Sequence, residues 1–473
     1  MAEARIGLVG LAVMGANLAL NIAEKGFPVV VHNRTTSVID DFIAGAGDLA
    51  SRLVPAQDYA AMAAALTPPR AIIIMVKAGA PVDGVIDDLK PHLDKGDIII
   101  DAGNADFNDT RRREAALRDE GFRFVGMGVS GGEEGARHGP SIMVGGAAEA
   151  YDAIAEIVNA IAATYQDSPC AAHMGPDGAG HFVKTVHNGI EYADMQMIAE
   201  IYGLLRHGEG RDPKSIGKLF EGWDGGPLQS YLVEITAKVL AADDPETGKP
   251  MVDVIQDMAG QKGTGRWTVI EALKLGQSPS TIEAAVAARS WSAAKQLRET
   301  GADLLPADKA ADPGPALLDR DLERALLAAR VIAYAQGFQL LRAASEEFDW
   351  SLDLARTAEI WRAGCIIRSS LLDDIATAFR SDLPGGLLIL APAFVRVLGE
   401  TVGALRRVVA QATLGGLPVP ALSSALGYYD TMRLARGTAS LIQAQRDFFG
   451  AHGFGRVDRD GDGFHGPWGS GAA

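Results

Sequence analysis

The stretch IGLVGLAVMG, residues 6–15, decides the fold of the first part of this chain. Ile6–Val9 is a short apolar run typical of a buried strand, and the helical spacing of Ala16–Lys25 begins directly after it. Glycines between a strand and a helix are typical of a dinucleotide-binding turn, because Gly10 permits a tight turn and the helix start presents N–H groups to a pyrophosphate. Ala12 replaces the usual middle glycine, so a generic strand-to-helix turn is the alternative. The expected cofactor contacts in this turn are Gly10, Ala12, Val13, Met14 and Gly15.

The alternation of short apolar runs and helical segments continues to about Gly180. The runs are Ile6–Val9, Val29–His32, Ala71–Val76, Asp97–Asp101, Arg123–Val125 and Ile142–Val144. Strands rich in Ile and Val that alternate with helices predict a parallel sheet covered on both faces. We therefore expect a doubly wound, Rossmann-like α/β domain.

After Gly180 the pattern becomes helical and strand-like runs are nearly absent. The expected helices are His181–His207, Ala284–Thr300, Arg320–Glu347, Leu352–Ile366 and Thr401–Leu414, with a further buried helical piece at Leu387–Phe394. After Phe449 the sequence has no periodicity. Three parts are therefore predicted, an α/β cofactor domain at 1–179, an all-helical domain at 180–440 and a C-terminal tail at 441–473.

The composition limits the partners. The chain carries 44 Lys and Arg against 60 Asp and Glu, a formal net charge of −16. Such a surface repels nucleic acid and anionic membranes, so an anionic substrate must be held by a local cluster of basic side chains. Cys170 and Cys365 are too few for a disulfide framework or a thiolate metal site. With no signal-peptide pattern and no apolar run of membrane length, we expect a cytoplasmic protein.

The end of the second expected strand favours NADP over NAD. An NAD site has an Asp or Glu about 20 residues after the glycine turn, where it binds the ribose 2′-hydroxyl. Here the sequence is Asn33-Arg34-Thr35, without a carboxylate. Arg34 can pair with a 2′-phosphate and stack on adenine, and Thr35 adds a hydroxyl donor. A solvated loop arginine is the alternative, but it would leave the missing acid unexplained.

Two further strand ends lead to the same crevice. Residues 76–79 close the third expected strand and residues 101–104 close the fourth. Ligands of such sheets bind beyond the carboxyl ends of the strands, so Val76, Lys77 and Ala78 are expected cofactor contacts. Asn104 is expected near the nicotinamide, where it could contact cofactor and substrate. A purely conformational role in the turn is the alternative for Asn104.

The segment HFVKTVHNGIEY, residues 181–192, is the most informative for chemistry. Lys184, His187, Asn188 and Glu191 recur at i, i+3, i+4 and i+7, so they share one face of a helix. Such a stripe is usually a solvated face. Here it begins beside the glycine-rich segment 177–180, at a domain junction, where ligand clefts tend to lie.

Lys184 and Glu191 are the candidate acid–base pair. Cationic neighbours in a cleft would lower the pKa of the Lys184 amine and make it a general base. Glu191 lies roughly 10 Å further along the helix, so the two groups can serve different carbons of an extended substrate. A Lys–Glu ion pair is the alternative, but a spacing of i+7 is too long for direct pairing on a helix.

A second glycine-rich loop and several scattered basic residues complete the candidates. Residues 129–137, VSGGEEGAR, follow a strand, and Ser130, Gly131 and Gly132 offer hydroxyl and N–H groups to a carboxylate. A plain flexible turn is the alternative. The basic side chains suited to a phosphate are Lys262, Arg266, Arg289, Arg446 and His452. No periodicity links them, so the residues alone do not predict that they converge.

These motifs resemble those of the 6-phosphogluconate dehydrogenases (decarboxylating), nearly from end to end. The matching segments, in the family's order, are GLAVMG at 10–15, NRT at 33–35, VKAG at 76–79, VSGGEEGAR at 129–137, HFVK-x-VHNGIEY at 181–192, KGTG-x-WT at 262–268 and RD-x-FGAH at 446–452. The resemblance implies an NADP-dependent oxidoreductase of gluconate utilization and the oxidative pentose phosphate pathway.

The resemblance also implies a mechanism. Lys184 takes the proton of the 3-hydroxyl while hydride leaves carbon 3 of 6-phosphogluconate for NADP. The 3-keto acid then loses carbon dioxide, and Glu191 protonates carbon 1 of the enediol to give ribulose 5-phosphate. Ser130, Gly131, Gly132, His187 and Asn188 would bind the carboxylate and hydroxyls, and Tyr192, Lys262, Arg289, Arg446 and His452 would surround the phosphate. Because the family supplies the last two from the partner subunit's tail, a homodimer with shared active sites is implied.

The sequence departs from the family pattern at five positions. Val144 replaces proline, His138 and Phe448 replace tyrosine, Arg266 replaces lysine and Ala105 replaces serine. None of the five is assigned to the chemistry, although Ala105 lacks a hydroxyl near the expected nicotinamide position.

No metal is expected. Asp458–Gly463 matches the start of a calcium loop, but Gly469 stands where that loop needs a bidentate glutamate. Two other functions are considered. A dehydrogenase of small 3-hydroxy acids would share the serine loop and the Lys–Asn helix but would lack Lys262, Arg289 and the tail. A dinucleotide-binding sensor would not need Lys184 and Glu191, and a preference for NAD is a third alternative.

Overall fold

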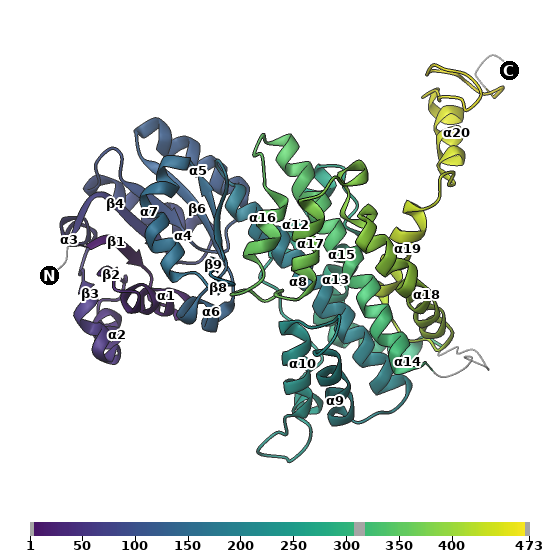
Figure 1. The fold of residues 1–473 in the computed structure, drawn as a ribbon, viewed down its shortest axis with the longest axis horizontal. Helices are drawn as coiled ribbons and strands as arrows, with labels where there is room; N and C mark the ends of the chain where they lie inside the picture. Colours follow the sequence, from purple (N-terminus) through teal and green to yellow (C-terminus); the bar gives the residue numbers. More distant parts are fainter. Residues whose placement is uncertain (1–3, 307–316, 469–473) are drawn as a thin grey trace. The chain divides into compact units, whose positions relative to one another are not determined.

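The computed structural model describes residues 4–306 and 317–468, which form two compact units divided between Ala425 and Leu426. The first unit opens with a sheet and its covering helices, drawn in purple to blue in Figure 1, and continues with helices alone. The expected fold class, a Rossmann-like domain followed by an all-helical region, is confirmed.

Eight strands form the main sheet, in the order β10-β7-β6-β5-β4-β1-β2-β3. Their bounds are β1 Ala4–Val9, β2 Val29–His32, β3 Leu53–Pro55, β4 Leu66–Ile74, β5 Ile98–Asp101, β6 Arg123–Val129, β7 Ile142–Gly146 and β10 Ala171–Gly175. All six expected strands are present. The sequence analysis missed β3, β10 and the small hairpin of β8 (Thr164–Tyr165) and β9 (Ser168–Pro169).

The sheet is not parallel throughout, and this part of the prediction was wrong. Strands β6 and β7 pair antiparallel, while β10 runs parallel to β7. The helix between β6 and β7, α6 (Gly132–His138), packs against α1 (Val13–Glu24). The chain therefore does not cross the sheet face here, and it returns beside β6 in the opposite direction.

Helices cover both faces because successive strand residues point to opposite sides. Ile73 and Ile100 belong to one buried cluster, and their neighbours Ile72 and Ile99 belong to the other. The first cluster includes α1, α2 (Ser37–Gly45) and α7 (Ala148–Ile161). The second includes α3 (Tyr59–Ala65), α4 (Ala80–Leu89) and α5 (Phe107–Glu120). This leaves the carboxyl ends of the strands for the connecting loops.

The helical region starts with α8 (Ala179–Gly203), which continues into one π-helical turn at Leu204–Gly208. The expected helix over 181–207 is thus confirmed. The other helices are α9 Pro213–Trp223, α10 Tyr231–Ala241, α11 Met251–Val254, α12 Thr264–Lys274, α13 Ser280–Ala293, α14 Lys295–Leu304, α15 Asp319–Glu347, α16 Leu354–Ile360, α17 Leu371–Phe379 and α18 Pro392–Leu414. Helices α12, α13 and α15 all contact α8, so α8 is the central element of this region.

Several expected helices have different bounds. The segment 284–300 is two helices, α13 and α14, which meet at a non-helical Ala294. Helix α16 ends well before 366, and the chain turns at Gly364, whose φ is +70°. Residues 387–394 are not one helix, since Leu388–Leu390 form a 3₁₀ turn and α18 starts at Pro392. Proline favours this first helical position because its φ is already helical.

The start of α8 lies in backbone contact with the sheet. A Cβ on Gly180 would lie 2.5 Å from the carbonyl oxygen of Gly126, and one on Gly128 would lie 2.5 Å from the Cβ of Lys184. Any side chain at these glycines would push the helix away from β6. The glycines therefore fix the position of Lys184 against the sheet.

The second unit contains the end of α19 (Pro420–Met432) and α20 (Ala439–Gly450). Its centre is the buried carboxylate of Asp447, which accepts hydrogen bonds from the backbone N–H of Gly453 and Gly466 and from the Trp468 indole, each at 2.9 Å. His465 Nδ1 lies 2.6 Å away. These donors, the Gly466 N–H first, lower the pKa of Asp447 to about 2.

Within residues 4–306 and 317–468, no helix combines the length and apolar character needed to cross a membrane. The same residues contain no group of three or more His, Cys, Asp and Glu side chains placed to hold a metal ion. Gly469, at the position where a calcium loop has its bidentate glutamate, lies outside the described residues. Both cysteines are free and buried.

Candidate active site

The glycine turn after β1 has the geometry that a pyrophosphate requires. Gly10 has a φ of +100°, and a Cβ there would lie 2.5 Å from the Met75 carbonyl oxygen. A Cβ on Gly15 would overlap the Gly10 carbonyl, so α1 can approach the turn only with glycine there. Ala12, at the N-cap of α1, offers no side-chain acceptor to the first-turn N–H groups. These N–H groups are therefore available to an anionic ligand.

The three expected cofactor contacts in the loop after β2 have different roles. The Asn33 side chain accepts a hydrogen bond from Leu11 N–H at 3.1 Å and donates one to the Thr35 carbonyl at 3.1 Å. Asn33 thus joins the first two loops of the site. Arg34 and Thr35 are exposed, and no ion pair engages Arg34 within the described chain. The Arg34 guanidinium is consequently free to bind a ligand phosphate.

The loops after β4 and β5 lie against each other. A Cβ on Gly103 would be 3.3 Å from the carbonyl oxygen of Val76. Lys77 and Asn104 are exposed, and Val76 and Ala78 are half-buried. Because β1, β2, β4 and β5 are neighbours that all run parallel, the structure brings the four predicted cofactor segments to one edge of the sheet.

The predicted face of α8 forms a buried polar cluster. Lys184 Nζ donates to Asn188 Oδ1 at 2.7 Å and to Ser130 Oγ at 3.0 Å, and His187 Nδ1 lies 3.4 Å away. Ser130 Oγ also lies 3.2 Å from His187 Nε2. The serine loop and the α8 stripe, more than 50 residues apart in sequence, thus meet at the Lys184 amine.

Burial sets the protonation of this cluster. It lowers the pKa of Lys184, while Glu191 opposes the shift. Burial also lowers the pKa of His187 well below its usual value, and the Lys184 charge adds to this effect. The direction expected for Lys184 is present, but its main cause is burial and not cationic neighbours. His187 is itself held neutral.

Glu191 lies on the same helix face as Lys184 but has fewer polar contacts. Its side chain is 21% exposed, and its closest polar contact is His187 Nδ1 at 3.9 Å. No hydrogen bond to its carboxylate is found among the described residues. Burial raises its pKa, opposed by the charges of Lys184 and Arg289. The protonated form of Glu191 is therefore favoured more than that of an exposed glutamate, which suits a proton donor.

The serine loop has the conformation of an anion-binding turn. Gly131 and Gly132 have φ values of +101° and +62°, and α6 begins at Gly132. A Cβ on Gly131 would be 2.5 Å from the Gly364 carbonyl oxygen. The N–H groups at this helix start lie next to the Ser130 hydroxyl, so the loop can present several donors to one carboxylate.

Arg289 and Tyr192 form a second patch, beside Glu191. The Arg289 guanidinium lies over the Tyr192 ring at 3.9 Å from its centroid. Gly265, near the start of α12, packs against the same ring, since a Cβ there would be 2.6 Å from Tyr192 Cδ2. Lys262, three residues earlier, is exposed and belongs to the loop that leads into this contact. The resemblance implies five residues around the phosphate. Three of them, Tyr192, Lys262 and Arg289, therefore come from elements that meet at Tyr192.

Arg446 and His452 belong to the second unit. Arg446 lies on α20, is exposed and donates to Gln443 at 3.0 Å. His452 is also exposed.

Sequence reasoning missed the loop at 361–365. The Trp361 ring meets the His187 ring edge-on at 5.4 Å, and the Gly364 carbonyl accepts from Ser141 N–H at 2.8 Å. The buried Cys365 thiol is near enough to Lys184 to influence its charge. No motif marks this loop, because its role depends on contacts across more than 170 residues.

Comparisons with known proteins agree with this site. The family model described as the NAD binding domain of 6-phosphogluconate dehydrogenase matches residues 5–175. The model of the 6-phosphogluconate dehydrogenase C-terminal domain matches residues 180–468. The two models together cover nearly the whole chain.

Similar proteins match over their full length. A decarboxylating 6-phosphogluconate dehydrogenase of Escherichia coli K12 is 48% identical over 99% of this chain and 100% of its own. The NADP(+)-dependent, decarboxylating enzyme of Bacillus subtilis is 46% identical over 99% and 100%. Among solved structures, the Plasmodium falciparum 6-phosphogluconate dehydrogenase, determined apo, with its cofactor NADP+ and with its substrate 6-phosphogluconate, matches with a TM-score of 0.94 and 41% identity, covering 98% of this chain and 100% of that one.

Proposed function

This chain belongs to the 6-phosphogluconate dehydrogenase family, and on that premise we propose that it oxidises 6-phosphogluconate with NADP and releases carbon dioxide and ribulose 5-phosphate. The observation that carries the proposal is the buried contact of Lys184 with Ser130 and Asn188, with an unpartnered Glu191 on the same helix face. These groups supply one base and one acid in the order that an oxidative decarboxylation needs.

The cofactor edge of the sheet fits NADP. The tight turn at Gly10, the uncapped start of α1 and the unpaired Arg34 suit a pyrophosphate and a 2′-phosphate. Residues 76–78 and Asn104 would flank the nicotinamide half, and Asn104 would also reach the substrate. NADP, when bound, supplies the hydride acceptor for carbon 3.

Lys184 acts on the 3-hydroxyl. Burial favours its neutral amine, which accepts the hydroxyl proton as carbon 3 is oxidised. When the bond between carbons 1 and 2 breaks, its electrons move toward the 3-keto oxygen and carbon dioxide leaves. The Lys184 ammonium, now beside that oxygen, returns the proton and stabilises the enediol. Asn188 and Ser130 hold the amine in place throughout.

Glu191 completes the reaction. Because burial raises its pKa and so favours the protonated carboxyl group, Glu191 can deliver a proton to the carbon that has lost the carboxyl group. The neutral Lys184 amine takes the proton of the enediol hydroxyl group at the same time, so that the ketone of ribulose 5-phosphate forms. The spacing from Lys184 to Glu191, about two helical turns, lets the two groups work on different atoms of one substrate.

The remaining proposed contacts match the carboxylate, hydroxyl and phosphate groups of the substrate. Ser130, Gly131 and Gly132 would bind the carboxylate, with His187 and Asn188 on the hydroxyls. Tyr192, Lys262 and Arg289 would bind the phosphate. Lys262 and Arg289 meet the need for a local positive cluster on a chain with a net charge of −16.

We further propose that the enzyme is a cytoplasmic homodimer in which Arg446 and His452 reach the partner subunit's phosphate site. The tail unit supports this, because Phe448 and Phe449 are 68% and 73% exposed, and Leu441 and Ile442 are exposed as well. The proposed division is a cofactor domain at 1–179, a substrate and dimerisation domain at 180–440 and a docking tail at 441–473.

The proposed reaction is tested by steady-state turnover. With NADP, 6-phosphogluconate should be oxidised and a small 3-hydroxy acid should not. Turnover of only the small hydroxy acid would support the alternative dehydrogenase. Turnover of neither compound, with NADP still bound, would support the sensor.

Replacing Arg34 tests the cofactor choice. Because a charge-assisted hydrogen bond contributes about 1.5–3 kcal/mol, R34A should reduce kcat/KM for NADP by about tenfold or more and leave that for NAD nearly unchanged. An equal loss with both cofactors would contradict the contact with the 2′-phosphate.

A further inference from the structure

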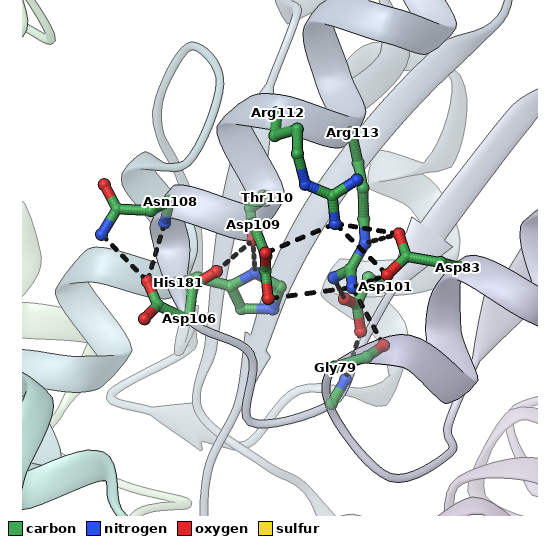
Figure 2. Close-up of polar contacts among 11 residues, drawn as sticks. Gly79, Asp83, Asp101, Asp106, Asn108, Asp109, Thr110, Arg112, Arg113 and His181 are labelled. Atoms are coloured by element: carbon green, nitrogen blue, oxygen red, sulfur yellow. Dashed lines mark hydrogen bonds and ion pairs between the residues drawn. The ribbon is translucent and has the colours of Figure 1, made fainter.

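Arg113 is a buried cation that the catalytic scheme does not use. It lies on α5, its side chain is only 2% exposed, and its guanidinium touches no proposed substrate or cofactor residue directly. Figure 2 shows it between Asp83, at the start of α4, and Asp101, at the end of β5. A charge this deeply buried must be fully paired, so its partners show what it holds together.

One guanidinium joins both loops on the nicotinamide side. Arg113 Nε and Nη2 donate to the two oxygens of Asp83 at 2.8 and 3.0 Å, and Nη2 also donates to the Gly79 carbonyl at 3.0 Å. Its Nη1 donates to Asp101 Oδ2 at 3.2 Å. Gly79 ends the loop after β4, while Asp101 begins the loop after β5 (Figure 2).

Asp101 transmits the contact to the second loop. Its other oxygen, Oδ1, accepts from Gly103 N–H at 3.0 Å, one residue before Asn104. Gly103 in turn lies against the Val76 carbonyl. The positions of residues 76–79 and 101–104 relative to each other therefore depend on the Arg113 guanidinium.

The helix that carries Arg113 is also tied to the catalytic helix. Thr110, one turn earlier on α5, lies with its Oγ1 2.7 Å from His181 Nδ1 (Figure 2). His181 precedes Lys184 by one turn of α8, and both Thr110 and His181 are buried. Gly126 leaves room for this pair, since a Cβ there would meet both side chains.

We propose that Arg113 is a positioning residue for the cofactor, which holds the two loops of the nicotinamide side in register with each other and with Lys184. It acts through Gly79, Asp83 and Asp101 and does not touch the cofactor itself. The inference rests on the proposed function for the identity of the ligand, NADP. Lysine cannot replace arginine here, because one ammonium group cannot reach two carboxylates and a carbonyl in the same plane.

The test is direct binding of NADP+ to the full-length protein by titration calorimetry. R113K should raise the Kd for NADP+ by about tenfold, since contacts of a charged group are lost. The Kd for 6-phosphogluconate should change by less than about threefold, because Asn104 is the one proposed substrate contact on these loops and the others lie on other elements. A merely structural role would lower the folded fraction and leave both Kd values of the folded protein unchanged.

The chain provides a matched control in Arg112. This neighbouring arginine pairs with the same Asp83, at 3.0 Å, but its side chain is 56% exposed (Figure 2). Because exposed pairs contribute little, R112M should keep the Kd for NADP+ within about twofold. If R113K does not fold, D83N serves in its place, because the Asp83 side chain is partly exposed. D83N should raise the Kd for NADP+ by about threefold.

The outcomes separate the two proposals. A folded R113K, or D83N in its place, with an unchanged Kd for NADP+ would overturn the role of Arg113. An R112M effect as large as that of R113K would also overturn it. If the wild-type protein binds NADP+ but does not turn over 6-phosphogluconate, the proposed function fails while the binding comparison still decides the role of Arg113.

Discussion

Two glutamates on α8, the half-buried Glu191 and the buried Glu200, differ in a way that separates catalysis from structure. Burial raises the pKa of both, that of Glu200 to about 7. Glu200 nevertheless accepts hydrogen bonds from Ala421 N–H at 2.8 Å, Leu422 N–H at 2.9 Å and the Gln196 amide at 3.0 Å. The carboxylate of Glu191 has no such donor within the described chain, and its nearest polar neighbour is 3.9 Å away.

The difference shows that a shifted pKa does not identify a catalytic group by itself. Glu200 caps the first turn of α19, so its oxygens are already occupied by the protein. Glu191 keeps its oxygens free and shares its helix face with Lys184, whose charge influences it. The number of hydrogen-bond donors to each carboxylate, more than its burial, therefore assigns Glu191 to the chemistry and Glu200 to the fold.

The largest expected effect comes from removing the base that faces Glu191. K184M should reduce kcat by about 1,000-fold, within the usual range for general acid–base groups, while the melting temperature stays the same or rises because a buried polar group is lost. K184R is the matched control, since it keeps the positive charge but cannot become neutral at working pH. A K184R variant with near wild-type kcat would show that Lys184 acts only as a charge.

Removing the acid should have the next largest effect. E191Q keeps the shape of the side chain but cannot donate a carboxyl proton, so kcat should fall by about 100-fold with little change in the KM for NADP. E200Q, the same substitution two and a half turns along the same helix, should leave kcat within about twofold. Equal losses of activity in the two variants would remove the distinction between the two glutamates.

The pH dependence of kcat tests the pair together. Lys184 must start neutral, so the rate should rise with pH toward its lowered pKa. Glu191 must stay protonated, so the rate should fall above its raised pKa. A bell-shaped profile results, with slopes of about tenfold per pH unit and two apparent pKa values that belong to the coupled pair. E191Q should lose one limb of the bell and E200Q should keep both.

The smallest expected effect on activity belongs to E200Q, which should instead lower stability. The Gln amide would place its own donors against the N–H groups of Ala421 and Leu422, at a cost of about 1–3 kcal/mol in the free energy of unfolding. Chemical denaturation of E200Q and E191Q measures this difference. A more severe loss of stability in E191Q than in E200Q would contradict the assignment of roles.

Local patterns allowed much of the site to be predicted from the sequence. The glycine turn at 10–15 and the spacing from Lys184 to Glu191 are short-range features, and their geometry follows from strand, turn and helix periodicity. The antiparallel direction of β7 beside β6 was not predictable, because it depends on the packing of α6 on α1 and not on the residues of the strand.

Contacts between residues far apart in the sequence explain why the roles of some residues could not be predicted. The partners of Glu200 lie more than 220 residues away, and the hydrogen bond of Ser130 with Lys184 spans 54 residues. Arg113 lies in a charged segment, FNDTRRREAALRDE, that is indistinguishable from an exposed helix until its buried partners are seen. Positions of this kind depend on the tertiary fold, so no local motif marks them.

The most direct test of the Lys184–Glu191 pair as an oxidative decarboxylation centre is the ratio of products. Reduced cofactor and carbon dioxide are measured together while the wild-type protein acts on 6-phosphogluconate with NADP. We expect equal amounts of NADPH and carbon dioxide, and we expect K184M to form neither. NADPH formed without carbon dioxide would contradict this expectation, because the chain would then be a simple hydroxy-acid dehydrogenase.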